Sequence, residues 1–216
     1  MKLVFLGPPG AGKGTQAVRL AERFGVVHAS TGQIFRQAVA EESELGRSVK
    51  DYLDGGKLVP DALTSRVVGE MVLDRTEDYI LDGYPRTLQQ AQDLDDMLRE
   101  RGDRLDVVVC FHIGDEEAVR RLTGRLVCTE CGANYHREFM PPRVEGVCDK
   151  CGGALAVRSD SAEDVVRERL REYHLKTQPL VEFYRERGLI EQVDASASPD
   201  QVTRRTEAVL SRIGET

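Results

Sequence analysis

Apolar residues along the chain fall into two alternating patterns. Short apolar runs lie at 2–6, 26–29, 79–81, 107–113 and 189–193, and each is typical of a strand covered on both faces. Between them, apolar residues recur at helical spacing. We expect helices directly after the first run, where the pattern is Ala17, Leu20, Ala21 and Phe24, and at about 61–74, 87–101, 115–122, 162–187 and 199–213. This alternation predicts an α/β fold with a parallel five-stranded sheet flanked by helices.

Two regions interrupt the alternation. Residues 30–59 carry helical pieces with a turn at 54–57, "DGGK". Residues 124–161 are rich in glycine, proline and cysteine, and they indicate an inserted small module. In α/β sheets, ligands bind at the carboxyl ends of the strands, so we expect both insertions there.

Composition narrows the class of protein. The chain of 216 residues has 30 Lys plus Arg and 37 Asp plus Glu, a net charge of −7. That balance argues against nucleic acid as the main partner. The apolar run at 2–6 is too short for a signal-peptide core, and no apolar stretch approaches the roughly 20 residues that span a bilayer. We therefore expect a cytoplasmic protein without a membrane partner, whose thiols stay reduced.

The segment "GPPGAGKGT" at 7–15 is close to a phosphate-binding loop. Gly7, Gly12 and Lys13 fit the pattern, but Gly14 stands where a hydroxyl ligand for magnesium is usual, and Thr15 comes one residue late. A tight turn without a ligand is the alternative. The position between a strand and a helix favours phosphate binding, because backbone amides at a helix N-terminus cradle anionic oxygens.

Without a hydroxyl at Gly14, Mg²⁺ must be held mainly by nucleotide oxygens and water, which it tolerates well. Asp82 ends the apolar run at 79–81 and could orient those waters. The alternative is that Asp82 is only a turn residue before Gly83.

Four cysteines in the second insertion have the spacing C-x2-C-x16-C-x2-C: Cys128, Cys131, Cys148 and Cys151. Four thiolates at this spacing predict a closed, structural Zn²⁺ site, although iron can also occupy an all-thiolate site. Disulfides or free thiols would be the interpretations without a metal. Cys110 lies in an apolar run and is interpreted as core. A zinc-ribbon module that binds nucleic acid or protein remains a different class of function, but acidic residues offset the few basic ones around the cysteines.

Several motifs together resemble the nucleoside monophosphate kinases, and among them the adenylate kinases with a long bacterial lid. They are "GPPGAGKGT", "STGQIFR" at 30–36, "LVPDAL" at 58–63, "DGYPRT" at 82–87, "TGR" at 123–125 and "EYHLKTQPL" at 172–180. The resemblance implies a P-loop NTPase-like core of residues 1–29, 60–123 and 162–216. It also implies a helical insertion for the monophosphate at 30–59 and a small zinc-ribbon-like lid at 124–161.

The implied reaction is reversible transfer of a phosphoryl group from Mg-ATP to AMP, giving two ADP, by a monomer. The resemblance assigns ATP to Gly10, Ala11, Gly12, Lys13, Gly14, Thr15, Arg121, Arg125, Asn134, Tyr135 and Ser198. It assigns AMP to Thr31, Arg36, Lys57, Leu58, Val59, Gly83, Tyr84, Pro85, Arg86, Gln90, Arg158 and Arg169. The residues that it implies in catalysis are Lys13, Asp82, Arg86, Arg125, Arg158 and Arg169.

This set suits the chemistry, because the attacking oxygen belongs to an anionic phosphate and needs no general base. Two positions depart from the family pattern. Gln33 stands where aspartate is commonest, and Ser161 stands where a second aspartate is usual, so a lid-closing ion pair is missing. Ser161 and Asp164 resemble an N-cap pair that opens the long helix. A kinase of the same fold for UMP or CMP and a nucleotide-gated switch remain as rivals, although Thr31 and Gln90 favour adenine.

Overall fold

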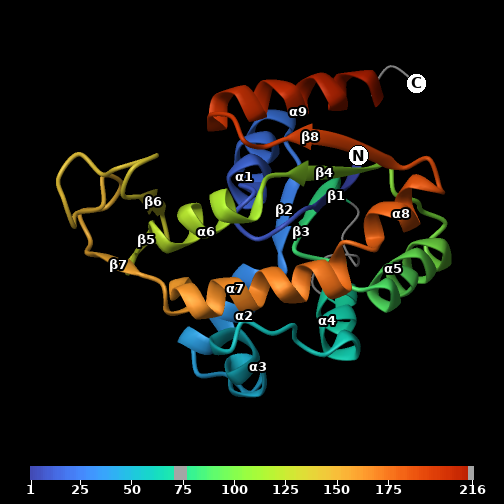
Figure 1. Cartoon of the computed structure of the whole chain (residues 1–216). Helices are drawn as coiled ribbons and strands as arrows, with labels where there is room; N and C mark the ends of the chain where they lie inside the picture. Colours follow the sequence, from blue (N-terminus) through green and yellow to red (C-terminus); the bar gives the residue numbers. More distant parts are fainter. Residues whose placement is uncertain (71–76, 214–216) are drawn as a thin grey trace.

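A five-stranded parallel sheet forms the centre of the molecule (Figure 1). The structure is a computed structural model and describes residues 1–70 and 77–213. The sheet order is β2-β3-β1-β4-β8, with strands Val27–Ser30, Tyr79–Asp82, Lys2–Leu6, Val107–His112 and Ile190–Asp194. Each neighbouring pair is parallel. All five predicted strands are therefore confirmed, with ends that differ by at most one residue.

Side chains that alternate along the strands build two apolar layers. On one face, Leu3 and Phe5 of β1 pack with helices α1 (Lys13–Phe24) and α9 (Pro199–Ile213). On the other face, Val4 and Leu6 pack with α5 (Leu88–Glu100) and α8 (Leu180–Arg185). The sheet is buried on both sides, which explains why its strands are continuous apolar runs. No helix in the described residues is both long enough and apolar enough to cross a membrane.

The region expected as the monophosphate insertion is helical. It contains α2 (Thr31–Ala40) and α3 (Glu44–Asp54), followed by α4 (Asp61–Val68). Phe35, Val49, Val59 and Val67 form a small apolar cluster that joins these helices. Residues 71–74 of the helix predicted at 61–74 lie outside the described residues.

The second insertion follows α6 (Asp115–Thr123) and carries its own small antiparallel sheet, which projects from the body of the molecule (Figure 1). Its strands are β5 (Arg125–Cys128), β6 (Asn134–His136) and β7 (Leu155–Val157), in the order β6-β5-β7. The hydrophobic pattern did not predict these strands, because three or four residues are too few for a period to emerge. We call residues 124–161 the lid.

The helix predicted at 162–187 is a chain of three helical pieces. It consists of α7 (Glu163–Glu172), a π-helical turn η3 (Tyr173–Thr177) and α8. Pro179 explains the wide turn, because proline lacks an N–H group and its ring clashes with the carbonyl four residues earlier in an α-helix. The amide of Gln178 instead bonds Tyr173 O at 2.8 Å, five residues back.

The N-cap expected from Ser161 and Asp164 is wrong. Helix α7 begins at Glu163 with Ala162 as its N-cap and has no side-chain capping bond. Ser161 lies one residue earlier, in a short 3-10 turn (η2, Ser159–Ser161), where its Oγ is buried without a hydrogen-bond partner among the described residues. The turn moves Ser161 out of reach of the first amides of the helix.

Candidate functional site

A cleft of about 1280 Å³ lies at the carboxyl end of the sheet and is lined by the core, the helical insertion and the lid. The sheet directs the ends of β1, β2 and β3 into it, so that the phosphate-loop region, Ser30 and Asp82 meet there. Every residue predicted for the two nucleotides lines this cleft except Tyr84. Segments that are more than a hundred residues apart in the sequence therefore converge on one space.

The glycine-rich loop turns sharply into α1. Gly10 and Gly12 have φ values of 86° and 83°, in the left-handed region that favours glycine, and Gly12 is the N-cap of the helix. Lys13 Nζ donates to Gly7 O at 2.7 Å and to Pro8 O at 2.8 Å, so the side chain folds back over its own loop. Burial, with help from the cations Arg86 and Arg169, lowers the pKa of Lys13 to about 8 against the opposing charge of Asp82.

Asp82 lies across from the loop. Its Oδ2 is 3.3 Å from His28 Nε2, and an ideal Cβ at Gly14 would approach the same oxygen to 3.2 Å. Burial favours the neutral acid, but the His28 hydrogen bond and the charges of Lys13 and Arg86 hold the pKa of Asp82 below its ordinary value. The carboxylate is therefore kept ionised in a largely enclosed position.

The segment 83–90 forms a second wall of the cleft. Gly83 O accepts hydrogen bonds from Thr31 Oγ1 at 2.9 Å and from Arg86 Nε at 2.7 Å. Gly83 has φ of 86°, and a Cβ there would lie 2.8 Å from the Arg86 guanidinium, so glycine is required. The Tyr84 side chain points away, into the core, where its hydroxyl donates to Ser65 Oγ and Gln90 O. The AMP contact predicted for Tyr84 therefore does not extend to its side chain.

Arginines line the cleft beneath the lid. Asp160 accepts from Arg158 Nε at 2.9 Å and from Arg169 Nη1 at 3.1 Å, and thereby joins the two guanidinium groups. Burial and the neighbouring cation Arg158 lower the pKa of Arg125 and of Arg169 to about 10, and Asp160 opposes the shift in both. Arginines that are held close together, largely shielded from water, form a site for a polyanion.

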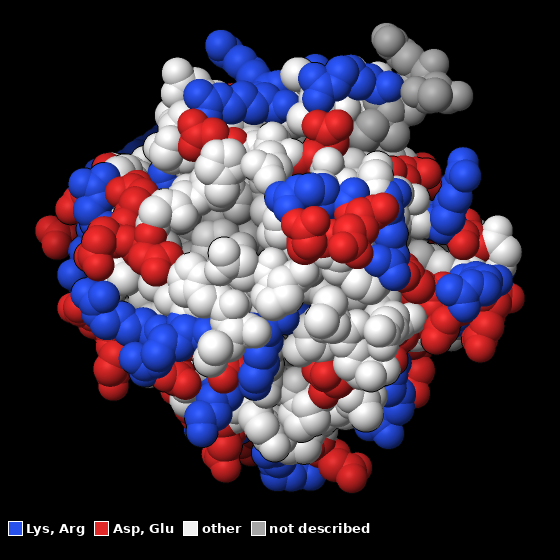
Figure 2. Space-filling view, turned by 45° about the vertical axis from the view of Figure 1, so that its right-hand side comes forward, with Lys and Arg blue, Asp and Glu red and all other residues white. Residues whose placement is uncertain are grey.

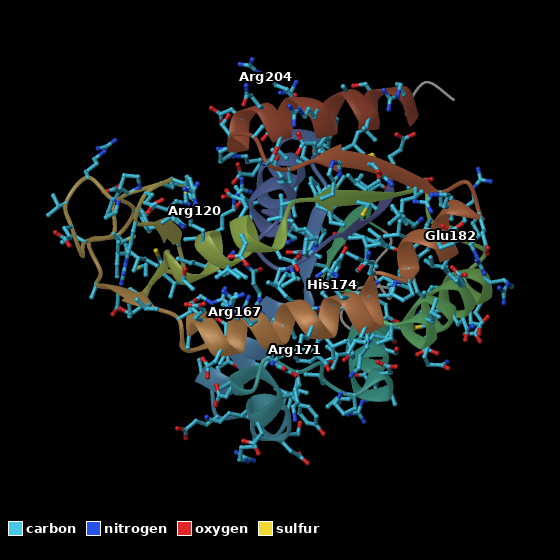
Figure 3. All side chains as sticks on the ribbon, viewed as in Figure 1. Arg120, Arg167, Arg171, His174, Glu182 and Arg204 are labelled. Atoms are coloured by element: carbon cyan, nitrogen blue, oxygen red, sulfur yellow. The ribbon has the colours of Figure 1, made fainter. Side chains whose placement is uncertain are left out.

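The outer end of the cleft is bounded by the loop 195–198. Arg121 donates to Ala195 O at 2.9 Å and to Ser196 O at 3.2 Å, while Glu117 Oε1 accepts from its Nε at 2.7 Å. The neighbouring Arg120 is labelled in Figure 3, and its guanidinium carbon lies 4.6 Å from the centroid of the Phe139 ring of the lid. Backbone carbonyls, a guanidinium plane and an aromatic ring give this end the character of a base-binding pocket.

The four lid cysteines converge. Their Sγ atoms all lie within 4.8 Å of one another, with Cys128–Cys151 at 3.4 Å and Cys131–Cys148 at 3.6 Å. Tetrahedral thiolates around Zn²⁺, with Zn–S distances of about 2.3 Å, would be about 3.8 Å apart. The cluster therefore fits a metal of that size. Tyr135 packs beside it, with its hydroxyl 3.5 Å from Cys148 Sγ.

Two residues near the reaction space are not identified by the sequence. His28 belongs to none of the motifs in the sequence, yet its Nε2 contacts Asp82 Oδ2. Asp160 stands between Ser159 and Ser161 in the sequence, where nothing shows that its carboxylate lies between the guanidinium groups of Arg158 and Arg169. No signal in the sequence shows the contact of His28 with Asp82, because it depends on β2 lying beside β3 with Ser30 paired to Asp82 in register.

Comparison with known proteins agrees with this geometry. The family model described as "Adenylate kinase" matches residues 5–189. The adenylate kinase of Archaeoglobus fulgidus is 46% identical over 215 residues, which are 99% of this chain and 99% of that protein. The adenylate kinase of Symbiobacterium thermophilum is 49% identical over 205 residues, which are 94% of this chain and 95% of that protein.

Proposed function

Because the chain belongs to the adenylate kinase family, we propose that its cleft transfers a phosphoryl group reversibly between ATP and AMP, giving two ADP. The observation that carries the proposal is the shared cleft, in which a glycine-rich loop with Lys13 faces a second wall with Arg86 and Gln90. One wall suits a triphosphate and the other suits an acceptor. Two anions must be brought together here, and the arginines between the walls supply the opposite charge.

Each group has a proposed task. The loop amides and Lys13 hold the phosphates of ATP, and Lys13 has to release Gly7 O and Pro8 O to do so. Arg86 holds the phosphate of AMP. Arg125, Arg158 and Arg169 neutralise the group in transfer, because this reaction depends on positioning and charge rather than on a general base.

Magnesium would arrive with ATP. We place Asp82 near its water ligands, since Asp82 is ionised and Gly14 offers no oxygen. When bound, the metal neutralises phosphate charge. Gln33 also lines the cleft but carries no charge, so Asp82 is the acidic group expected to take this role.

The lid would exclude water. If water replaced AMP as the acceptor, ATP would simply be hydrolysed. A lid that carries Arg125 at its start and Arg158 near its end brings cations into the cleft as it closes. We propose that Cys128, Cys131, Cys148 and Cys151 hold Zn²⁺, which makes the lid rigid.

The remaining expectations stay predictions: a monomer, a cytoplasmic location and the division of the chain at residues 30, 60, 124 and 162. On the face shown in Figure 2, acidic and basic side chains are interspersed around a largely uncharged centre. That face offers no broad cationic surface for nucleic acid.

The test is an acceptor panel. The protein is incubated with Mg-ATP and each of AMP, GMP, CMP and UMP, and the products are separated. ADP formed in excess with AMP alone supports the proposal. Preferential formation of UDP or CDP would assign a different acceptor. If no phosphoryl group is transferred to any of the four monophosphates, the proposed kinase activity is refuted.

A further inference from the structure

The carboxamide of Gln90 is held from two sides at the edge of the cleft. Its Oε1 accepts from the backbone N–H of Arg86 at 2.7 Å, and its Nε2 donates to Asp61 Oδ1 at 2.8 Å. Gln90 is 2% exposed, so water competes little for either contact. Asp61 is the first residue of α4 and Gln90 lies in the first turn of α5, and the two helices thus meet through this pair.

The two neighbours fix which end of the amide is which. A backbone N–H can only donate, and a carboxylate can only accept. If the amide turned over, Nε2 would face the N–H of Arg86 and Oε1 would face the oxygens of Asp61. Both contacts would then be repulsive and both buried groups would be left unsatisfied.

Asp61 is itself held in place. Its second oxygen, Oδ2, accepts from Thr87 Oγ1 at 2.9 Å, and Thr87 Oγ1 accepts from Gln90 N at 3.2 Å as the N-cap of α5. Asp61 also lies in the first turn of α4, where a negative charge is favourable. The carboxylate therefore cannot easily turn to follow a reoriented amide.

After these bonds, Gln90 can offer a base one N–H from Nε2 and one lone pair on Oε1. Adenine presents the matching pair, an N6–H donor and an N1 acceptor. Hypoxanthine and guanine present the reverse pair, an O6 acceptor and an N1–H donor. An amide that cannot turn over accepts the first pair and meets the second with two unfavourable contacts.

We infer that Asp61 is a specificity-determining residue that selects a 6-amino purine over a 6-oxo purine by fixing the orientation of the Gln90 amide. The inference rests on the proposed function, in that the base of the monophosphate contacts Gln90. Asp61 needs no contact with the nucleotide and acts as a positioning residue.

The experiment compares AMP with IMP, because hypoxanthine has the reversed donor and acceptor but lacks the additional amino group of guanine. We would measure kcat/KM with Mg-ATP, and equilibrium binding of each monophosphate by calorimetry, for the full chain and for Asp61→Asn and Asp61→Ala. An asparagine can donate or accept, so its side chain no longer opposes the reversed amide and only the Arg86 N–H does. We expect the AMP-to-IMP ratio to fall by about tenfold, the order that a paired contact to a base edge contributes.

Asp93→Asn is the matched control. Asp93 lies on the same helix and also accepts from a glutamine amide, Gln89 Nε2 at 2.8 Å, and from Ser65 Oγ at 2.6 Å, but it does not line the cleft. Thr87→Val is a second test, since it removes the contact to the other oxygen of Asp61 and the cap of α5. It should lower the melting temperature and should lower the AMP-to-IMP ratio less than Asp61→Asn does, because the carboxylate of Asp61 remains.

The inference is overturned if the Asp61 variants lose AMP and IMP activity in parallel, if Asp93→Asn shifts the ratio as strongly, or if the unmodified protein binds both monophosphates equally. Binding separates this failure from failure of the proposed function. If the protein binds AMP more tightly than IMP but transfers no phosphoryl group, the proposed kinase activity is refuted. The ratio of the two binding constants in the Asp61 variants would still test the role of Asp61.

Discussion

An ideal Cβ on Gly14 would lie 3.2 Å from Asp82 Oδ2, which is tighter than most contacts that a Cβ atom makes. Gly14 lacks the usual hydroxyl of a phosphate loop, and the carboxylate of Asp82 occupies the space beside it. Glycine at this position lets β3 bring an ionised group against the first turn of α1.

Restoring the usual residue should therefore harm the enzyme. We predict that Gly14→Ser lowers kcat by about tenfold to a hundredfold, because Asp82 must move and small misplacements in an active site cost that much. Gly14→Ala should do the same, yet leave stability unchanged or raised by up to about 1 kcal/mol, since alanine favours helix. Steady-state rates and thermal unfolding measure both. Gly114→Ala, whose Cβ would meet open space, is the control. Full activity of Gly14→Ser would contradict the crowding.

ATP binding should take up a proton at mildly alkaline pH. The pKa of Lys13 is lowered to about 8 without ligand, mainly by burial. Phosphate charge would raise it, so Lys13 should gain a proton on binding above pH 8, and ATP affinity should fall as pH rises. Calorimetry at pH 8.5 in two buffers of different ionisation enthalpy measures the uptake.

Lys13→Arg is the control for this linkage, because arginine stays protonated throughout the range. Its binding should show no proton uptake at pH 8.5. Equal uptake by both proteins would assign the titration to another group.

Metal removal should unfold the lid before the core. We expect about one Zn²⁺ per chain, and a chelator should lower the melting temperature, because a small module with little core depends on its metal. Cys131→Ser should lose the metal, whereas Cys110→Ala should keep it, since Cys110 is a residue of β4 in the apolar core. Metal analysis of reduced protein is the measurement. Stoichiometric metal in Cys131→Ser would count against the four-thiolate site.

Loss of the hydrogen bond between Thr177, in the π-helical turn, and Arg86 should weaken the binding of AMP and leave that of ATP unchanged. Thr177 Oγ1 donates to Arg86 O at 2.8 Å, so it fixes the segment that carries Arg86. We predict that Thr177→Val raises KM for AMP about fivefold, as expected for a lost hydrogen bond of about 1 kcal/mol, with KM for ATP unchanged. Thr177→Ser should restore the value. An equal rise in both KM values would mean general loosening of the fold.

The sheet was predictable because its strands are buried on both faces and so appear as separate apolar runs. The phosphate loop, the four lid cysteines and the arginines of the cleft were also predictable as motifs. The pairing of His28 with Asp82 was not, because it depends on which strands are neighbours, and α2, α3 and α4 lie between β2 and β3 along the chain.

The role of Asp61 was hidden for a related reason. Its partners Thr87 and Gln90 are more than 25 residues away, and nothing in "LVPDAL" shows that the carboxylate turns toward them. The N-cap expected at Ser161 failed because local spacing cannot show that a 3-10 turn intervenes before α7. Motifs identify the participants, whereas their orientation depends on contacts between distant segments.

Because of the wide turn at Tyr173–Thr177, the number of residues in this segment should matter more than their identity. Leu175 is 73% exposed, so many replacements there should be tolerated. Deletion of Leu175 should not be tolerated. One residue fewer would force an ordinary α turn, in which the ring of Pro179 would clash with the carbonyl four residues earlier, and would strain the segment that holds Thr177 against Arg86. Among related chains, position 175 should therefore accept substitutions but not a deletion.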